Sequence, residues 1–250
     1  MENKNWSVWD REKAYGEIFY KRASGILPEM ESSKRMALEV KNVIKPDDKI
    51  LDVGCGAGHY LRSLKREIKE DFRYVGIDKT SYYIELAKRA YGMDCRAQFA
   101  VSDVFSIDFE ENTFDIVMCN NLLLHLPSIE KPLSEIIRVA KRKVLIRFLC
   151  GERSFRIKDI NPESEAYDEN GEPFEFSYLN IYSASYIESL IRSQKKALRW
   201  EIEPDIAFDR QGILNSVDEH KKAYNSTKII GDFQVNGYVL LPWTILKIDL

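Results

Sequence analysis

This sequence has few histidines and cysteines, and it has no excess of basic charge. Its 250 residues include three His and four Cys, and no two cysteines form a CxxC pair. Without paired cysteines we expect reduced thiols and neither a disulfide framework nor a metal site. Lys and Arg number 37 against 40 Asp and Glu, which gives a net charge of -3. Nucleic-acid binders normally carry a basic excess, so we expect no nucleic-acid partner.

Long apolar stretches are lacking as well. The longest runs, such as 122–124 and 238–243, are far too short to cross a bilayer. The opening residues MENKNWSVWDREK are polar and charged and have no apolar core of the secretory kind. We therefore expect a cytoplasmic protein without a membrane partner. The oligomeric state cannot be predicted from these features.

Apolar segments alternate between the strand and helix types along the middle of the chain. Strands are predicted at 49–53, 74–77, 98–101, 114–119 and 143–149, and helices at 60–69, 81–91 and 129–140. Such alternation is typical of βαβ units. The prediction is an α/β fold with a Rossmann-like, doubly wound, mostly parallel sheet and helices on both faces.

The flanking segments differ from this regular core. We expect one domain over 1–250, with an N-terminal helical cap at 1–45, a cofactor-binding core at 48–149, and an insertion plus C-terminal strands at 150–250. The insertion follows the fifth strand and carries seven acidic residues and no basic one over 159–175. This acidic run favours either a solvated loop or a site that attracts a cationic acceptor.

A glycine cluster follows the first predicted strand, in the segment Asp52-Val-Gly-Cys-Gly-Ala-Gly58. Glycines allow a tight turn and a close approach of the backbone to a ligand. The helix that follows begins with unpaired N–H groups, which suit a nucleotide. His59 occupies the position of the last glycine in the dinucleotide pattern GxGxxG, which weakens the case for a dehydrogenase.

Polar residues also follow the next three strands. Asp78 ends the second strand, Asp103 follows the third, and Asn120 and Asn121 follow the fourth. The carboxyl ends of neighbouring strands in an open α/β sheet meet at the ligand-binding crevice. Each aspartate alone could instead cap a helix or a turn. As a set in register with the glycine cluster, they predict a nucleotide site.

Together these motifs resemble the class I S-adenosylmethionine-dependent methyltransferases that act on small molecules. The resemblance covers about 48–149: the segment 52–58 matches the first motif, Asp78 the second, 102–104 the third and 114–126 the fourth. The family's usual proline-glycine-glycine before the fifth strand is replaced by Lys141-Arg142-Lys143, so we expect a differently built turn there.

The resemblance implies S-adenosyl-L-methionine as the cofactor and a set of cofactor-binding residues. These are Asp52, Gly54, Cys55, Gly56, Gly58, Asp78, Lys79, Asp103, Val104, Asn120 and Asn121. It implies that the glycines lie against the methionine part, that Asp78 binds the ribose and that Asp103 and Val104 hold the adenine. The backbone carbonyl of Asn120 would bind the methionine amino group.

The implied reaction is in-line methyl transfer to a small-molecule acceptor, a sugar or another metabolite. A general base is needed only if the acceptor must lose a proton, and His125 is the candidate because it follows the fourth strand. A packing role for His125 is the alternative. Tyr15, Tyr20 and Arg22 are candidates for acceptor recognition. A methyltransferase for nucleic acid or protein and a non-catalytic cofactor-binding protein remain as alternatives.

Overall fold

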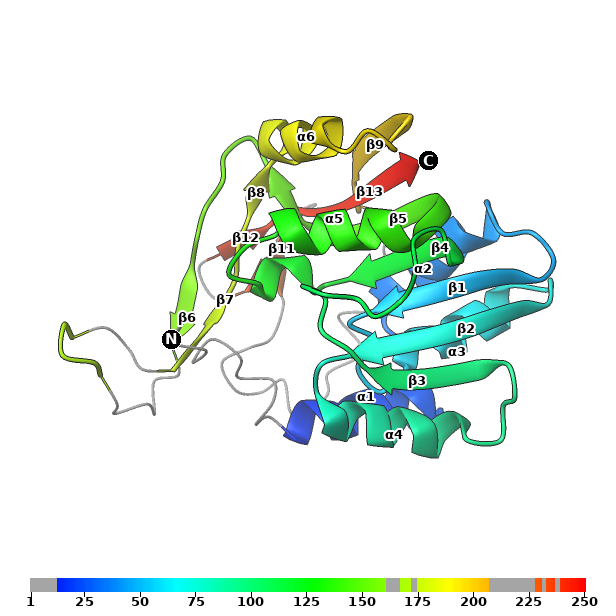
Figure 1. Ribbon diagram of the computed structural model, residues 1–250. Helices are drawn as coiled ribbons and strands as arrows, with labels where there is room; N and C mark the ends of the chain where they lie inside the picture. The colour runs from blue at the N-terminus through cyan, green and yellow to red at the C-terminus, as the bar shows by residue number, and fades with distance from the viewer. Residues whose placement is uncertain (1–12, 161–166, 172–174, 207–227, 231–232, 237–238) are drawn as a thin grey trace.

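An eight-stranded sheet forms the centre of the computed structural model, which describes residues 13–160, 167–171, 175–206, 228–230, 233–236 and 239–250 (Figure 1). The helices are α1 (Lys13–Ala23), α2 (Glu31–Lys41), α3 (His59–Glu67), α4 (Ser81–Tyr91), α5 (Glu130–Val139) and α6 (Ala184–Ser193), with a 3-10 turn, η2, at Leu123–His125. The strands are β1 (Asp48–Val53), β2 (Phe72–Asp78), β3 (Ala97–Val101), β4 (Phe114–Asn120), β5 (Ala140–Gly151), β6 (Lys158–Ile160), β7 (Phe176–Tyr178), β8 (Tyr182–Ser183), β9 (Arg199–Pro204), β10 (Lys228–Ile230), β11 (Phe233–Asn236), β12 (Val239–Leu241) and β13 (Trp243–Asp249).

The order of strands in the sheet confirms the predicted fold class. It runs β3-β2-β1-β4-β5-β13-β9, with β8 beside the end of β5. The first five strands in this order are parallel, whereas β13 is antiparallel to both β5 and β9. In Figure 1 the arrowheads of β1, β2 and β3 point one way and that of β13 points the other. The chain reverses its winding direction between β1 and β4, which is where open α/β sheets bind ligands.

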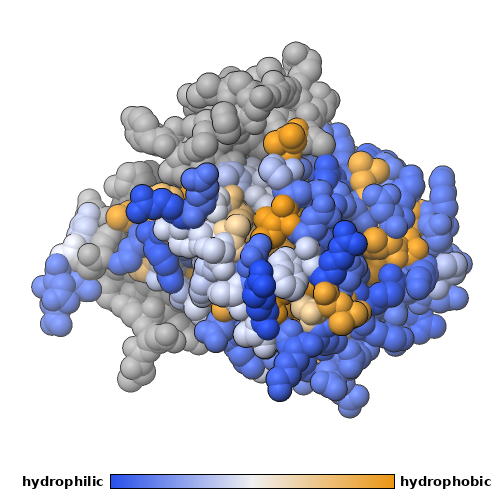
Figure 2. Space-filling model, turned by 90° about the horizontal axis from the view of Figure 1, so that it is seen from above, coloured by the Kyte–Doolittle hydropathy of each residue, from blue (hydrophilic) through white to orange (hydrophobic). Residues whose placement is uncertain are grey.

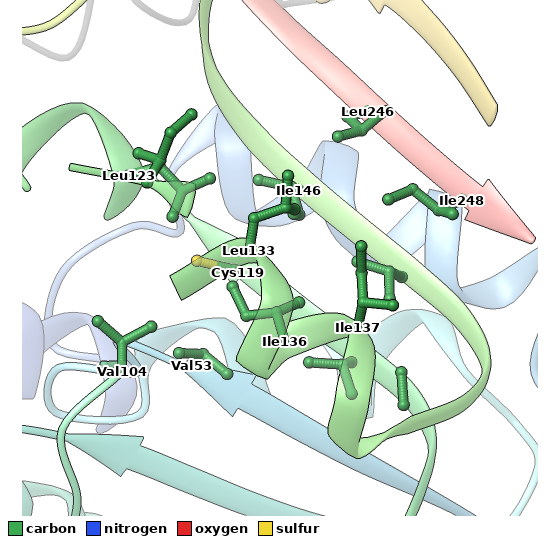
Figure 3. Packing of buried hydrophobic residues seen from close by; sticks show 14 of the residues in the cluster. Val53, Val104, Cys119, Leu123, Leu133, Ile136, Ile137, Ile146, Leu246 and Ile248 are labelled. Carbon is green, nitrogen blue, oxygen red and sulfur yellow. The ribbon is translucent and has the colours of Figure 1, made fainter. Parts of the chain in front are cut away.

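Helices cover both faces of the sheet because alternate strand residues are buried on opposite sides. On one face α5 packs through Leu133, Ile136 and Ile137 onto Val53 and Ile146 (Figure 3). On the other face a second cluster joins α2, α3 and α4 to β1, β2, β4 and β5; its members include Met36, Leu61, Ile84, Ile50, Tyr74, Ile116 and Leu145. This two-sided burial explains the continuous apolar runs of the central strands.

The segment before the fifth strand corrects one expectation. No turn is built at Lys141-Arg142-Lys143, because β5 begins at Ala140, directly after α5 ends at Val139. Within β5, Lys143 pairs with Asp249 of β13 at 2.6 Å. The three basic residues are therefore part of the sheet, which explains why the family's glycine-containing turn is missing.

The flanking segments form short additional elements. The predicted helical cap at 1–45 is broken into two helices: α1 ends at Ala23, Gly25 has φ of +84°, and α2 begins at Glu31. Its first part, 1–12, lies outside the described residues. After β5, the antiparallel strands β6 and β7 flank the acidic run, of which 161–166 and 172–174 lie outside the described residues.

Near the C-terminus the predicted strands include β12 and β13, which follow each other closely along the chain. β12 belongs to the separate sheet β10-β11-β12, and β13 belongs to the main sheet. Pro242 separates them, as expected for a residue that cannot donate to a ladder. Figure 2 looks onto the edge that carries α6 and β9 and shows a largely hydrophilic surface with separate hydrophobic patches. Among the described helices, none is both long and apolar enough to cross a membrane.

Candidate active site

A cavity of about 370 Å³ opens at the carboxyl ends of the parallel strands. It lies at the switch point between β1 and β4, where the fold predicts a ligand. Its wall is formed by Tyr15, Phe19, Met30, Val53, Gly54, Gly56, His59, Tyr60, Ile77, Asp78, Lys79, Thr80, Tyr83, Ser102, Asp103, Val104, Phe105, Asn120, Asn121, Leu122, Leu124, His125, Leu126, Leu179 and Trp243. Most of the residues predicted for the cofactor are thus brought together.

The glycine loop forms one side of the cavity. Gly54 and Gly56 have φ of +77° and +54°, a region that side chains with a Cβ rarely adopt. The backbone N–H of Gly54 donates to the carbonyl of Ile77 at 2.8 Å, which ties the loop to the end of β2. A Cβ at Gly54 would lie 3.0 Å from Leu122 Cδ2. Glycine is therefore required here for both conformation and space.

The Asp78 carboxylate connects the glycine loop to the next helix. Its Oδ2 accepts from the Gly56 N–H and its Oδ1 from the Thr80 N–H, both at 2.9 Å. Thr80 is the N-cap position of α4, so Asp78 shapes the turn that leads into this helix, the turn role considered from the sequence. Because the carboxylate lines the cavity as well, it is fixed in place before any ligand arrives.

Asp103 and Lys79 lie beside each other on the same part of the wall. Lys79 Nζ is 3.3 Å from Asp103 Oδ2, and both side chains are about two-fifths exposed. Asp103 Oδ1 accepts from the N–H of Phe105 at 3.0 Å, which shapes the turn after β3. Buried Val104 and partly buried Phe105 add apolar surface next to this carboxylate. A flat base with an exocyclic amino group suits such a combination.

Three wall residues carry buried polar atoms that lack a hydrogen-bond partner among the described residues. They are Ser102 Oγ, both amide atoms of Asn120, and His59 Nδ1. Unsatisfied buried polar atoms are uncommon in native proteins and often indicate a missing ligand. Burial lowers the pKa of His59 to about 3, so this imidazole is neutral, and it stacks on Phe19 at 4.5 Å. These residues fit a ligand rich in donors and acceptors, as S-adenosylmethionine is.

Three residues predicted to bind the cofactor lie behind the glycine loop and not on the cavity wall. Asp52 is 1% exposed and accepts from the Tyr74 hydroxyl at 2.7 Å. Burial raises the pKa of Asp52 to about 7. The Cys55 thiol is buried, and Gly58, with φ of +77°, faces Phe99. Their side of the turn faces the core, so they shape the loop instead of lining the site.

The three acceptor candidates are also divided. Tyr15 lines the cavity. Tyr20 and Arg22 do not: the Arg89 guanidinium lies 3.9 Å from the Tyr20 ring centroid, and Arg22 Nη1 donates to the Pro28 carbonyl at 2.7 Å. Phe19 reaches the wall in their place. The spacing of four residues from Tyr15, which puts both on one face of a helix, could have indicated it.

His125 lines the cavity from the η2 turn. Its Nδ1 lies 2.8 Å from the backbone carbonyl of Tyr178. Because a carbonyl only accepts, Nδ1 carries the proton and Nε2 carries the lone pair. Burial lowers the pKa of His125 to about 4, so the imidazole is neutral at pH 7. In this tautomer Nε2 is the ring atom that can accept a proton.

A buried polar network behind the cavity was missed by sequence reasoning. Arg147 pairs with Asp205 at 2.7 Å, donates to Asn121 Oδ1 at 2.7 Å and stacks over Trp243 at 3.9 Å. Asn121, with φ of +56°, also donates to the Tyr60 hydroxyl at 3.4 Å. These partners are far apart along the chain, so no local pattern indicates the network.

An open, mostly parallel sheet with a cavity at its switch point is typical of the Rossmann-like class of domains. A family model described as a methyltransferase domain matches residues 44–169, just over half of the chain. The chain therefore belongs to the methyltransferase domain family. The resemblance to class I S-adenosylmethionine-dependent methyltransferases is confirmed by this match and by the fold of solved methyltransferases.

Curated relatives match only part of the chain. The sterol 24-C-methyltransferase of Saccharomyces cerevisiae is 36% identical over 107 residues, 42% of this chain and 27% of that protein. Phosphoethanolamine N-methyltransferase 1 of Arabidopsis thaliana is 28% identical over 130 residues, 50% of this chain and 24% of that protein. The alignments thus span about a quarter of the length of these relatives.

Solved structures share the fold at low sequence identity. Phosphoethanolamine N-methyltransferase 2 of Haemonchus contortus, in complex with S-adenosyl-L-methionine, superposes with a TM-score of 0.61 at 18% identity. The superposition covers 98% of this chain and 59% of that one. A S-adenosylmethionine-dependent methyltransferase of Methanosarcina mazei gives a TM-score of 0.54 at 18% identity, with 84% and 96% covered.

Proposed function

We propose that this chain transfers a methyl group from S-adenosylmethionine to a small-molecule acceptor. The main structural support for this proposal is the cavity, which is lined by the glycine loop after β1, by Asp78 of β2 and by Asn120 of β4. Family membership supports the reaction type, and the partial relatives are named for small acceptors, a sterol and phosphoethanolamine. The absence of a nucleic-acid or membrane partner and the cytoplasmic location stay predictions.

The cofactor would be held by residues that the fold has already placed. Asp78 would accept from the ribose hydroxyls, while Asp103, Val104 and Phe105 would hold the adenine. Gly54 and Gly56 and the backbone carbonyl of Asn120 would hold the methionine part, as the family resemblance implies. When bound, the cofactor supplies a methyl group on a sulfonium, which is the reactive electrophile.

The chain's own contribution is alignment, exclusion of water and acceptance of a proton. Apolar wall residues such as Leu124 and Leu126 would keep water from the reacting atoms. Tyr15 would contact the acceptor from α1. His125, neutral and oriented by the Tyr178 carbonyl, would take a proton if the acceptor has one to lose.

Calorimetric titration with S-adenosylhomocysteine tests the cofactor site. We expect micromolar binding to the wild type, on the order of -8 kcal/mol, and a loss of about 100-fold, about 2.7 kcal/mol, in Asp78→Ala. Asp71→Ala is the matched control, because Asp71 lies before β2 at the opposite end of the sheet and its side chain is 73% exposed. Thermal unfolding of each variant separates lost binding from lost folding, since Asp78 also holds the glycine loop.

Two results would contradict the proposal. One is the absence of binding to the wild type, and the other is an equal loss in the Asp78 and Asp71 variants. Incubation with cofactor that carries a labelled methyl group, together with a metabolite mixture, then separates an enzyme from a non-catalytic binder.

A further inference from the structure

The part of the cavity around His125 has a different chemistry from the part that would hold the cofactor. Leu124 belongs to a separate buried cluster against which Leu179 and Trp243 pack. All three residues line the cavity, and Leu124 and Leu179 adjoin His125 and its partner Tyr178 in sequence. Apolar walls of this kind favour an apolar molecule, because its binding removes apolar surface of both partners from water.

The two buried charges near this apolar end, Arg147 and Asp205, pair with each other and do not line the cavity, and the second carboxylate oxygen of Asp205, Oδ1, has no partner among the described residues. Arg147 is 5% exposed and pairs with the equally buried Asp205 behind the Trp243 ring. Asn121 uses both amide atoms within the protein, accepting from Arg147 and donating to Tyr60. A charged acceptor would lose its hydration here without gaining a matched counter-ion from these groups.

The charged side chains on the described wall lie at the other end of the cavity. They are Asp78, Lys79 and Asp103, which follow β2 and β3 and are the residues proposed for the ribose and adenine. Near His125 the described wall therefore offers apolar surface and a neutral imidazole whose Nδ1 is held by the Tyr178 carbonyl.

From this juxtaposition we propose that the acceptor is an uncharged, largely apolar molecule that presents a hydroxyl group to His125, so that the product is a methyl ether. The inference rests on the proposed function and adds the class of acceptor and the atom that is methylated. It differs from carbon methylation and from methylation of a charged amine.

The step balances without a further reactant. The hydroxyl oxygen forms a bond to the methyl carbon as the carbon–sulfur bond breaks and its electron pair stays on sulfur. The hydroxyl proton moves to His125 Nε2 and is later released to water. A weakly basic imidazole is adequate, because the hydroxyl becomes strongly acidic as its oxygen bonds the methyl group.

Acceptors of matched size and different charge test the class. The full chain is incubated with methyl-labelled cofactor and 2-naphthol, 2-naphthoate or 2-naphthylmethylamine, and also with phosphoethanolamine and a sterol. We expect label on the naphthol oxygen, with kcat/KM at least about tenfold above that of the anionic and cationic probes. Faster labelling of an amine or of a sterol carbon would overturn the proposal, as would absence of label on every hydroxyl compound while cofactor binding is intact.

The variant His125→Asn tests the proton transfer. The amide N–H can still donate to the Tyr178 carbonyl, but the lone pair of Nε2 is lost. We expect kcat for 2-naphthol to fall about 100-fold or more with a small change in KM. An ionised nitrophenol should be a slower acceptor for the wild type because it is charged, but it has no proton to lose, so its kcat should be nearly insensitive to the substitution. Equal loss for both acceptors would show that His125 has only a structural role.

Failure of this inference can be distinguished from failure of the proposed function. If the wild type does not bind S-adenosylhomocysteine, the proposed function itself fails. If the cofactor binds and label appears on nitrogen or carbon, the methyltransferase proposal stands and only the class of acceptor is wrong.

Discussion

The two ends of the cavity are built in different ways. The cofactor end is formed by backbone and carboxylates at neighbouring strand ends, with Asp78 joined to Gly56 only 22 positions away. The acceptor end is formed by segments that are distant in sequence: α1, the η2 turn, the segment after β7 and the first residue of β13. One end depends on local backbone geometry, and the other depends on long-range packing.

The buried ionisable groups behind the two ends of the cavity also have different partners. Asp52 lies behind the glycine loop and has a tyrosine hydroxyl as its hydrogen-bond partner. Behind the acceptor end, Arg147 and Asp205 form a buried ion pair. This division allows one fold to retain a cofactor site while the acceptor end varies, since function depends on sites placed on a scaffold. Substitutions at the two ends should therefore have separable effects.

The largest effect on the free energy of unfolding is expected from Arg147→Met, at the acceptor end. The change leaves Asp205 as an uncompensated buried charge, which costs about 3–5 kcal/mol of unfolding free energy. Urea unfolding measures this loss. The double variant Arg147→Met/Asp205→Leu should recover most of it, because both charges are then absent. Arg96→Met, which breaks the exposed pair with Asp71, should cost less than about 1 kcal/mol.

If the two ends of the cavity are independent, the double variant will bind S-adenosylhomocysteine with a Kd within a few-fold of the wild-type value, while its kinetics with the acceptor will change. An equally large loss of cofactor affinity would show that the two ends of the cavity act as one unit.

The cofactor end could largely be predicted from the sequence because its signals are local. Each of Asp78, Asp103 and Asn120 follows an apolar strand, and parallel strands bring their carboxyl ends together. The sequence does not indicate which side of a turn faces the ligand. For this reason the sequence did not predict that Cys55 and Gly58 lie behind the loop, since they belong to the same motif as Gly54 and Gly56.

The acceptor end could not be predicted in this way. Trp243 reaches the wall because β13 pairs with β5, with Trp243 opposite Leu149. That pairing is made by tertiary packing and has no local signal. The helical cap was predicted as an element, yet which face of α1 reaches the cavity depended on its docking. Tyr15 and Phe19 point there, whereas Tyr20 contacts Arg89.

A second, smaller effect concerns the pH dependence of stability at the cofactor end. Burial raises the pKa of Asp52 from 3.8 to about 7, so the folded protein binds this proton more tightly than the unfolded chain. The contribution to stability is fully present below about pH 4 and is lost as the pH rises through about 7. Relative to Asp52→Asn, the wild type should lose roughly 2 kcal/mol between about pH 5 and about pH 7.

Urea unfolding at the two pH values measures the difference. Asp52→Asn keeps an amide oxygen for the Tyr74 hydroxyl, so the hydrogen bond survives. Asp71→Asn serves as an exposed control and should retain the wild-type slope. Identical slopes in the wild type and Asp52→Asn would show that the carboxyl is not the group that titrates.

The smallest effect on stability is expected at Asn180, which is fully buried and holds the η2 turn that carries His125. Its Nδ2 donates to the Leu126 carbonyl at 2.8 Å, and its backbone N–H donates to the Leu124 carbonyl at 2.9 Å. Asn180→Ala keeps the backbone bond but removes the bond to Leu126 and the 3.3 Å bond from Nδ2 to the Tyr182 hydroxyl. The buried Leu126 carbonyl then loses this donor, at a cost of about 1–2 kcal/mol.

The kinetic effect of Asn180→Ala is more informative than its effect on stability. A looser turn misplaces His125, so kcat should fall about tenfold while S-adenosylhomocysteine affinity stays constant. Ser189→Ala, which loses an exposed hydrogen bond within α6, should change neither quantity. Because Asn180 lies just after β7, a selective loss of kcat would show that the segment after the fifth strand contributes to catalysis by positioning a residue of the core. A parallel loss of cofactor affinity would instead show that the two ends of the cavity are energetically coupled.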